Sequence, residues 1–545
     1  MTVSVSFLGG LGEIGRNCAA LEVDGKICLI DIGLMFPEEE MLGVDLVFPD
    51  WSWLRERAGD VEFVVLTHGH EDHMGALPYF LRDINVPVYG SALALGIAAG
   101  RVEEAGIEAD WRPVEPLEWQ DHGPFRFQLI PVTHSVPDAC GIAFDTPEGI
   151  VVHSGDFKLD PTPIDGRPTD LAAFAQLGRW DVRLLLSDST NAESPGFVPS
   201  ERSLADPIRD IMKDAPGRVV AACFSSHIHR VQQIVTAGIA TGRTIALFGR
   251  SMQRNAEVAK DLGRLDIPGY ALVDIQELME LPQRNQLLIT TGSQGEPFAA
   301  LSLMAQGRYR FVKIAEGDTI LISATPIPGN ETAVSRVINQ LLRRGAAVFH
   351  GRNARVHVSG HGYQDELLTM LNLVRPRAMV PVHGEYRHLH AHAKLARMAG
   401  VPFVDVLEDG DRITLDGTET RIERRAFEAG YVYLDGSSFG DVKRAVLRDR
   451  GHLADEGVVV VTVAVSHQTG DIIYGPNLDS HGLTDDPSPI LLKAADAVRQ
   501  IVTDLANSTE TDRNQLQQAI RQAAAAVIRA ETSRKPVIIP VLLEL

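Results

Sequence analysis

Three histidines and an aspartate that could bind metal lie within six residues, shortly after an apolar run that ends at Leu66: His68, His70, Asp72 and His73. Imidazole nitrogens and carboxylate oxygens are the ligands that zinc and similar divalent ions prefer, at about 2.0–2.2 Å. In a tight loop after a strand, the first two histidines can face one ion while the carboxylate and the last histidine face a second. The segment therefore predicts a metal site, and a polar loop with hydrogen-bonded histidines is the weaker interpretation.

Three more candidate ligands each follow an apolar run: His134 after residues 129–132, Asp156 after 150–153, and His383 after 379–382. Taken singly, each would more often be a hydrogen-bonded loop residue. Four ligand-bearing loops in this order are much harder to assign to chance. A shared metal centre at the ends of several strands is therefore the preferred interpretation.

The 545 residues suggest about three domains. With 45% hydrophobic and 23% charged residues, the composition is that of a soluble globular protein and excludes a disordered or collagen-like chain. One of the longest apolar runs, residues 458–465, is too short to span a bilayer, which takes about 20 residues as a helix. No signal peptide is expected in the N-terminal residues, which lack a basic segment and a long apolar stretch.

The four cysteines are far apart in the sequence: Cys18, Cys28, Cys140 and Cys223. This spacing fits neither a disulfide framework nor a zinc site built from cysteines, so the thiols are expected to be reduced. A cytoplasmic protein without a membrane partner is therefore expected.

The first 200 residues alternate short β-rich runs with Gly- and Asp-rich turns, a pattern typical of α/β layering. From about Ser200, amphipathic helices alternate with apolar strands, which predicts a second, parallel-sheet domain inserted into the first. A helix at 364–373 and a strand at 378–382 follow. The last segment contains a strand at 458–465, helices at 490–506 and 512–530, and a strand at 537–543.

These patterns divide the chain into five segments. The first domain comprises residues 1–203 and resumes at 363–435, after the inserted domain at 204–362. A linker at 436–450 then leads to a small α/β domain at 451–545.

The order of the candidate ligands resembles the metallo-β-lactamase superfamily, whose motifs are His-x-His-x-Asp-His, a lone His, a lone Asp and a late His. The resemblance implies an αββα sandwich with two metal ions at one sheet edge. By this resemblance the first ion would bind His68, His70 and His134, the second would bind Asp72, His73 and His383, and Asp156 would bridge both.

His383 stands 227 positions after Asp156, more than a small hydrolase of this fold needs. The sequence resembles the β-CASP nucleases, which insert a domain there and carry further motifs that match SDSTN (residues 187–191) and HVSGH (357–361). Motif by motif it is most similar to the ribonuclease J family, through LGGLGEIG (8–15), FSSHIHR (224–230), TGSQGEP (291–297) and HGEYR (383–387).

The resemblance implies a 5′→3′ exonuclease on 5′-monophosphorylated RNA with endonuclease capacity, acting in mRNA decay and rRNA maturation. Two divalent ions, zinc or manganese, would activate water and stabilise the attacking and leaving oxygens. Asp72 is expected to serve catalysis as well as metal binding, and His361 to protonate the leaving oxygen. Asp188 is expected to orient a ligand histidine, with an Asx-turn as the alternative.

Two segments are expected to hold the 5′-phosphate, because their small or hydroxyl residues let backbone N–H groups point at an anion. They are Ser226, His227 and Ile228 in one segment, and His357, Val358, Ser359, Gly360 and His361 in the other. The glycines at positions 9, 10 and 12 are interpreted as a tight turn beside the metal loop. The resemblance also implies a structural calcium ion at Gly43, Asp45 and Asp435, and oxygen ligands suit calcium.

The resemblance further implies single-stranded RNA as the substrate, a homodimer whose dimers pair further, and membership of an RNA-degradation complex. Two alternatives stay open. A small-ester or lactam hydrolase of the same fold would leave the 227-position gap unexplained. A non-catalytic RNA-binding or scaffold protein would not need a complete set of metal ligands.

The charge is unevenly distributed along the chain, whose formal net charge is −21. Residues 204–362 hold 18 Lys and Arg against 13 Asp and Glu, a local net of +5. We therefore expect RNA to enter along the inserted domain, near these arginines: Arg230, Arg250, Arg254, Arg308, Arg310, Arg343, Arg344, Arg352 and Arg355. About half are expected to be ordinary solvated charges.

Overall fold

The structure, a computed structural model, describes residues 2–545 except 297–298, 328, 437, 470 and 507–512. Pro297 of the TGSQGEP motif and Asp512 at the start of a predicted helix lie outside the described residues. The chain forms two compact units. Unit 1 contains the residues up to Phe36 and Leu46–Val432, and unit 2 contains Pro37–Asp45 and Tyr433–Leu545.

Two sheets form the centre of unit 1. Among the described residues, the first sheet has the strand order β23 (Glu419–Glu423), β22 (Arg412–Asp416), β1 (Val3–Gly9), β3 (Cys18–Val23), β4 (Lys26–Ile30), β6 (Val61–Val65), β7 (Val88–Gly90) and β8 (Trp111–Pro113). The second has the order β21 (Phe403–Val404), β19 (Ala378–Val382), β13 (Val182–Asp188), β12 (Gly149–His153), β11 (Cys140–Thr146), β10 (Phe125–Pro131) and β9 (Gln120–His122).

The two sheets share one apolar core, to which both contribute fully buried side chains such as Phe63, Phe127 and Leu186. The outer face of the second sheet is covered by α5 (Leu171–Leu177), α12 (Gln364–Val374) and α13 (Tyr386–Met398). Helix α4 (Ala92–Glu104) packs on β7 and β8 of the first. Burial of apolar surface between these layers is the main stabilising term. The predicted αββα sandwich is thus confirmed.

The strand directions bring the candidate ligands to one edge of the sandwich. β4 and β6 are parallel neighbours in the first sheet. In the second sheet β12, β13 and β19 are parallel, and β10 runs in the same direction because it is separated from β12 by the antiparallel β11. The loops that follow these strands therefore meet where α/β sheets usually bind ligands.

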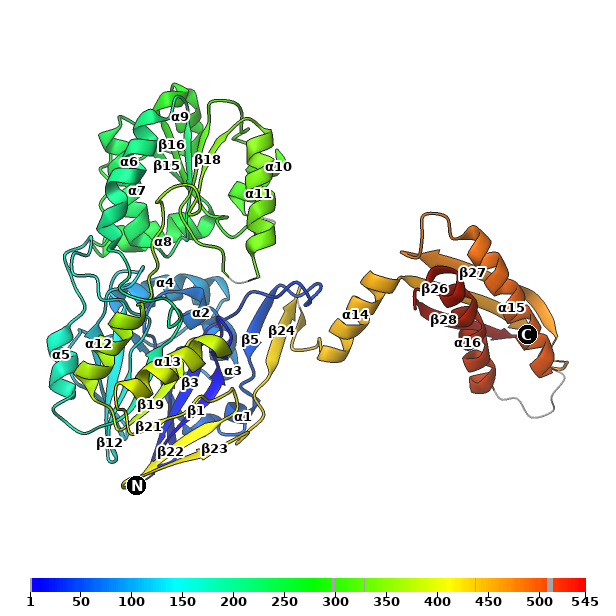
Figure 1. Ribbon diagram of the computed structural model, residues 1–545, viewed down its shortest axis with the longest axis horizontal. Helices are drawn as coiled ribbons and strands as arrows, with labels where there is room; N and C mark the ends of the chain where they lie inside the picture. The colour runs from blue at the N-terminus through cyan, green and yellow to red at the C-terminus, as the bar shows by residue number, and fades with distance from the viewer. Residues whose placement is uncertain (1, 297–298, 328, 437, 470, 507–512) are drawn as a thin grey trace. The chain divides into compact units, whose positions relative to one another are not determined.

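The inserted domain is a parallel sheet with helices on both faces (Figure 1). Its strand order is β15 (Thr244–Phe248), β16 (Gln286–Thr290), β14 (Val219–Ala222), β17 (Thr319–Ile322) and β18 (Ala347–Phe349). Helices α6 (Ala205–Asp214) and α7 (Ile228–Ala240) lie on one side, and α10 (Ala300–Gln306) and α11 (Glu331–Arg343) on the other. A sheet buried on both faces needs apolar strands, as the sequence pattern predicted.

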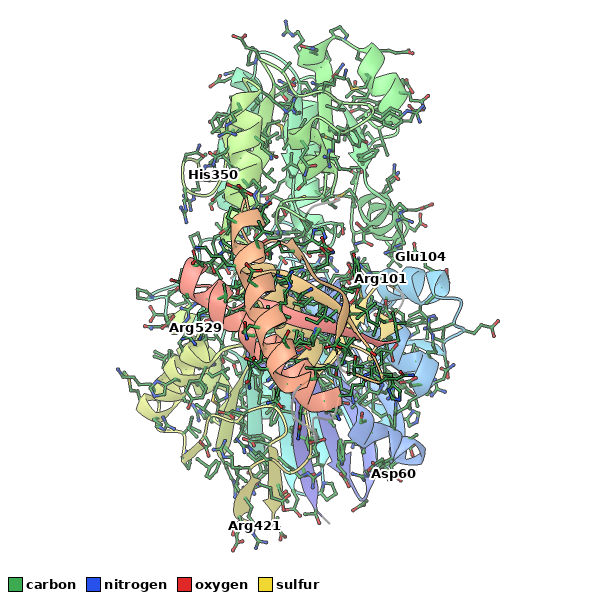
Figure 2. All side chains as sticks on the ribbon, turned by 90° about the vertical axis from the view of Figure 1, so that its right-hand side faces the viewer. Asp60, Arg101, Glu104, His350, Arg421 and Arg529 are labelled. Carbon is green, nitrogen blue, oxygen red and sulfur yellow. The ribbon has the colours of Figure 1, made fainter. Side chains whose placement is uncertain are left out.

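The inserted domain contacts the sandwich partly through charged side chains of α4. Arg101 and Glu104 lie on the part of α4 that faces the inserted domain (Figure 2). Arg254 of α8 (Arg250–Asp261) forms an ion pair with Glu104 at 2.6 Å. Arg101 pairs with Glu71, which lies inside the histidine-rich motif. Helix α4 therefore contacts both the loop that contains Glu71 and helix α8 of the inserted domain.

Unit 2 is built around the sheet β27 (Ile472–His481), β26 (Val458–Val465), β28 (Val537–Glu544), with α15 (Ser488–Ala506) and α16 (Arg513–Thr532) packed against it. The predicted linker at 436–450 includes the first turns of α14 (Arg444–Glu456). Within the described residues, the helices are too short or too polar to cross a membrane. The five predicted domain boundaries stay predictions.

Candidate active site

One group of candidate ligands combines His68, His70, His134 and Asp156, whose potential ligand atoms lie within 4.8 Å of one another. His68 Nε2 and His134 Nε2 lie 3.0 and 3.2 Å from His70 Nδ1. The nitrogens therefore face a common point. Three imidazoles and a carboxylate in this arrangement form a complete ligand set for one divalent ion.

A second group combines Asp72, His73, Asp156 and His383, again with ligand atoms within 4.8 Å of one another. His73 Nε2 lies 3.2 Å from Asp156 Oδ2, and His383 Nε2 lies 3.2 Å from Asp72 Oδ2. Asp156 belongs to both groups, so it stands where a bridging ligand must stand. The structure brings all seven predicted ligands together.

Asp156 provides the strongest test of whether the cluster suits metal ions. Its side chain is 2% exposed and neither carboxylate oxygen forms a hydrogen bond in the described residues, but His73 Nε2 lies 3.2 Å from Oδ2 and nitrogens of His68, His134 and His383 lie at 3.6–3.8 Å. A buried carboxylate that faces several imidazole rings is suited to bind a cation together with them. Burial alone would raise the pKa of Asp156, but the facing His383 and His73 rings hold it well below its ordinary value.

The pKa shifts of the histidines also favour cation binding. Burial lowers the pKa of His68 and His134 well below the ordinary value, and that of His70 to about 4, so these imidazoles are neutral and can donate lone pairs. Against the effect of burial, Asp156 and Asp72 raise the pKa of His73. A raised pKa favours a proton on His73, and a divalent ion would take the place of that proton. With neutral imidazoles in the first group and a cation-binding His73 in the second, the residues present fit two metal ions.

Hydrogen bonds from Nδ1 fix the orientation of three ligand histidines. His73 Nδ1 donates to Asp31 Oδ2 at 2.8 Å, and His134 Nδ1 donates to the Gly360 carbonyl at 2.8 Å. His383 Nδ1 donates to the Thr190 hydroxyl at 2.6 Å. In each ring Nε2 is left for a metal, and such partners typically fix the tautomer and raise the basicity of the ligand.

Asp31 is a site residue that the sequence analysis missed. It is fully buried at the end of β4, where it also accepts hydrogen bonds from the backbone and hydroxyl of Thr67 at 2.8 and 2.7 Å. The signal was present in the sequence, because Asp31 directly follows an apolar strand as the predicted ligands do. Its partner His73 lies 42 positions away, and only the fold reveals that contact.

Replacing Asp31 by asparagine is expected to weaken metal binding by about 10–100-fold, the usual effect of losing a partner of a ligand histidine. The amide keeps the size of the side chain but loses the charge that holds the His73 ring. Metal titration followed by calorimetry measures the effect. Asp60→Asn at an exposed position is the matched control, and equal affinities in the two variants would contradict the assigned role of Asp31.

Asp188 lies between a ligand histidine and the candidate proton donor. Its Oδ2 accepts a hydrogen bond from His361 Nδ1 at 2.8 Å, while its Oδ1 accepts one from the Thr190 hydroxyl at 2.8 Å. Asp188 Oδ1 also lies 3.7 Å from His383 Nδ1, and the Thr190 hydroxyl forms hydrogen bonds with both. The backbone N–H of Thr190 also donates to Oδ1 at 3.0 Å, so the Asx-type bond is present as well.

The two predicted phosphate-binding segments are neighbours. His227 caps α7, and its ring centroid lies 6.5 Å from that of His357. Gly360 lies against the His134 ring, because a Cβ at position 360 would come within 2.8 Å of that ring. The loop at 357–361 therefore lies directly beside the first ligand group.

The glycine-rich turn near the N-terminus lies beside the last ligand. β2 (Leu11–Gly12) pairs with β20 (Gly384–Glu385), and the Gly10 carbonyl accepts a hydrogen bond from the His383 N–H at 3.2 Å. Gly10 has φ of 92°, which favours glycine. This position agrees with the interpretation of a tight turn next to the metal loop.

The expectation that Arg230 contributes to an RNA-entry surface is wrong. Its side chain is fully buried and forms an ion pair with Glu201 at 2.7 Å. Arg254 pairs with Glu104, and Arg344 donates to the Ala305 carbonyl at 2.7 Å. The remaining arginines of that group are exposed: Arg250, Arg308, Arg310, Arg343, Arg352 and Arg355.

The predicted calcium ligands Gly43, Asp45 and Asp435 all belong to unit 2. Asp435 is paired with Arg450, whose guanidinium also lies 2.7 Å from the position of a Cβ added to Gly43. Asp45 accepts a backbone N–H at 2.8 Å. The Arg450 guanidinium already provides positive charge here, so these side chains suit a calcium ion poorly. The calcium site stays a prediction.

Four protein-family models match the chain. The metallo-β-lactamase superfamily matches residues 11–195, the ribonuclease J β-CASP domain 216–341, and the ribonuclease J C-terminal domain 445–545. The Zn-dependent metallo-hydrolase RNA specificity domain matches 350–406. Together these matches cover most of the sandwich, of the inserted domain and of unit 2.

Curated relatives match over nearly the whole chain. Ribonuclease J2 of Bacillus subtilis is 38% identical over 99% of this chain and 98% of its own length. Ribonuclease J of Mycobacterium tuberculosis is 41% identical over 99% of this chain and 97% of its own length. A crystal structure of a protein from Enterococcus faecalis shares the fold, with a TM-score of 0.56 and 16% identity over 76% of this chain and 100% of its own. The chain therefore belongs to the ribonuclease J family, within the metallo-β-lactamase superfamily.

Proposed function

We propose that this metal-dependent ribonuclease hydrolyses phosphodiester bonds of single-stranded RNA with two divalent ions, zinc or manganese. His68, His70 and His134 would hold one ion and Asp72, His73 and His383 the other, with Asp156 shared. The observation that supports this most strongly is the buried Asp156 carboxylate, which forms no hydrogen bond in the described residues and faces several histidine rings. When bound, the ions supply charge neutralisation at the phosphate and an activated water.

His361 is the proposed donor of the proton to the leaving 3′-oxygen. Its Nδ1 is held by Asp188 at 2.8 Å, so Nε2 is the nitrogen that can carry a proton toward RNA. Burial alone would lower the pKa of His361, but the facing Asp188 outweighs it and raises the pKa. The ring is also 19% exposed, which gives a substrate access to it. Asp188 would thus act by orienting His361.

The proposed 5′-phosphate subsite consists of residues 226–228 and 357–361. In the first segment the N–H groups of His227 and Ile228 are already bonded to the Phe224 and Ser226 carbonyls, so the free N–H groups that support the proposal belong to the second segment. In the described part of the chain, the backbone N–H groups of residues 357–360 have no protein acceptor. The neighbouring carbonyls, in contrast, accept from protein donors: Gly360 from His134 at 2.8 Å and His361 from Asn191 at 2.9 Å. A row of N–H groups that faces no protein acceptor is suited to bind an anion.

With this subsite beside the metal ligands, we infer a 5′→3′ exonuclease with endonuclease capacity. The corresponding roles are mRNA decay and rRNA maturation in the cytoplasm, as a homodimer whose dimers pair further, within an RNA-degradation complex.

The small-ester alternative is not carried forward. The 227-position segment forms a folded domain whose closing loop contributes to the site, and a small ester would not need it.

A comparison of RNA ends tests this function. We expect RNA with a 5′-monophosphate to be degraded about tenfold or more faster than the same RNA with a 5′-triphosphate, since a subsite built for one phosphate contributes at least about 1.4 kcal/mol of discrimination. Circular RNA should still be cut, but slowly. Time courses on labelled RNA, with zinc or manganese supplied, measure all three rates.

Equal rates on the two linear RNAs would exclude the phosphate subsite. Complete resistance of circular RNA would exclude the endonuclease capacity. Rapid hydrolysis of a lactam or thioester, without RNA cleavage, would restore the small-ester alternative.

A further inference from the structure

A buried ionic cluster lies behind the proposed phosphate subsite. Lys158, Glu201 and Arg230 are each 0–2% exposed. Glu201 Oε2 accepts from Arg230 Nη2 at 2.7 Å, and Glu201 Oε1 accepts from Lys158 Nζ at 3.3 Å. Asp160 balances the second cation, since its Oδ2 lies 3.9 Å from Lys158 Nζ. One carboxylate thus binds two cations inside the protein.

Both cations also bind the phosphate loop. Arg230 Nη1 donates to the Val356 carbonyl at 2.9 Å, and Lys158 Nζ donates to the Ser359 carbonyl at 3.1 Å. One of these carbonyls lies just before His357 in the chain, and the other lies just after Val358, at Ser359. The cluster therefore holds the loop by its carbonyl groups, while the N–H groups of residues 357–360 have no acceptor in the described residues.

The cluster joins three parts of the active site. Lys158 stands two positions after Asp156, and Arg230 stands two positions after Ile228 on α7. Glu201 begins η2 (Glu201–Leu204), where the chain enters the inserted domain. His227 Nε2 is buried without a hydrogen-bond partner and lies 3.7 Å from Glu201 Oε1.

We propose that Glu201 is a positioning residue that sets the distance between the 5′-phosphate subsite and the metal ligands. Through Lys158 and Arg230 it fixes both phosphate-binding segments relative to the loop that contains Asp156. This proposal rests on the proposed function and goes beyond it, because it assigns 5′-end recognition to a residue that does not touch the substrate. A buried ionic cluster is weak evidence for stability, so a geometric role accounts better for its presence.

The test compares Glu201→Gln with the wild-type enzyme on RNAs that carry a 5′-monophosphate or a 5′-hydroxyl, and on circular RNA. Glutamine keeps the shape but loses the charge that holds both cations. We expect the preference of about tenfold or more for a 5′-monophosphate to be lost, mainly through KM because the subsite no longer holds the 5′ end in place, and the loss on circular RNA to be much smaller.

Two further variants make the result interpretable. Asp206→Asn, an exposed carboxylate on α6, is the matched control and should keep the wild-type preference. The double variant Lys158→Met, Glu201→Gln removes one charge of each sign, so it leaves less uncompensated charge than the single change. Thermal unfolding and metal content establish that each variant is folded and loaded.

The outcomes separate the two proposals. If the wild-type enzyme shows no preference for the 5′-monophosphate, the proposed subsite itself is wrong. If the wild type shows the preference and either folded Glu201 variant retains it, the positioning role is wrong. Unfolding of both variants would mark the cluster as purely structural and would also overturn the proposal.

Discussion

Asp156→Asn should lower the rate of RNA cleavage by about 10³-fold or more, because metal ions contribute several kcal/mol to stabilising the transition state. Asp156 is the one residue shared by both ligand groups. An amide removes the negative charge that two divalent ions need between them. We expect the variant to bind fewer than two ions per chain and to lose activity in kcat.

The same variant should stay folded. Without metal, the Asp156 carboxylate faces the His73, His68 and His383 rings at 3.2–3.7 Å, so an amide loses this charge interaction but also removes the cost of burying a carboxylate. Because the two effects oppose each other, the melting temperature in a chelator should change little, while the increase on adding metal is lost. Asp145→Asn, at a more exposed position on β11, is the control. A folded Asp156→Asn enzyme with wild-type activity would contradict the shared-ligand assignment.

His361→Ala should lower the rate of RNA cleavage by about 10²–10⁴-fold, the range for loss of a general acid. The 3′-oxygen of RNA is a poor leaving group and requires a proton. A p-nitrophenyl phosphodiester has a leaving group that needs none, so its hydrolysis should fall much less. The ratio of the two losses separates proton donation from a general loss of structure.

Asp188→Asn provides a second test of the same pair. His361 keeps its ring but loses the carboxylate that holds Nδ1 at 2.8 Å, so RNA cleavage should fall while p-nitrophenyl ester hydrolysis is again less affected. His390→Ala on the exposed side of α13 is a control histidine outside the site. Equal losses on both substrates in His361→Ala would show that His361 does not act as an acid.

The clustering of the candidate metal ligands could be predicted because each belongs to a local pattern, a polar residue directly after an apolar strand. Parallel strands then bring these local patterns to one edge, whatever the intervening loops. The inserted sheet was predictable for a similar reason, since strands buried on both faces are apolar throughout. In these cases the physical cause lies within a few neighbouring residues.

The partners of those ligands depend on contacts across long sequence distances. Asp31 meets His73, and Glu201 meets Arg230 and Lys158, only after both layers and the inserted domain have packed. Arg230 illustrates the difficulty most clearly. In the sequence it is one of several basic residues, and only burial against Glu201 distinguishes it from the exposed arginines.

The most direct test of the two-metal account is a metal titration of chelated enzyme, with RNA cleavage and melting temperature followed together. Ions that bind only the folded protein stabilise it, so both signals should rise with added zinc or manganese and level off at two ions per chain. Cleavage of RNA by metal-free enzyme at the untreated rate, or full activity with one ion bound, would contradict the account.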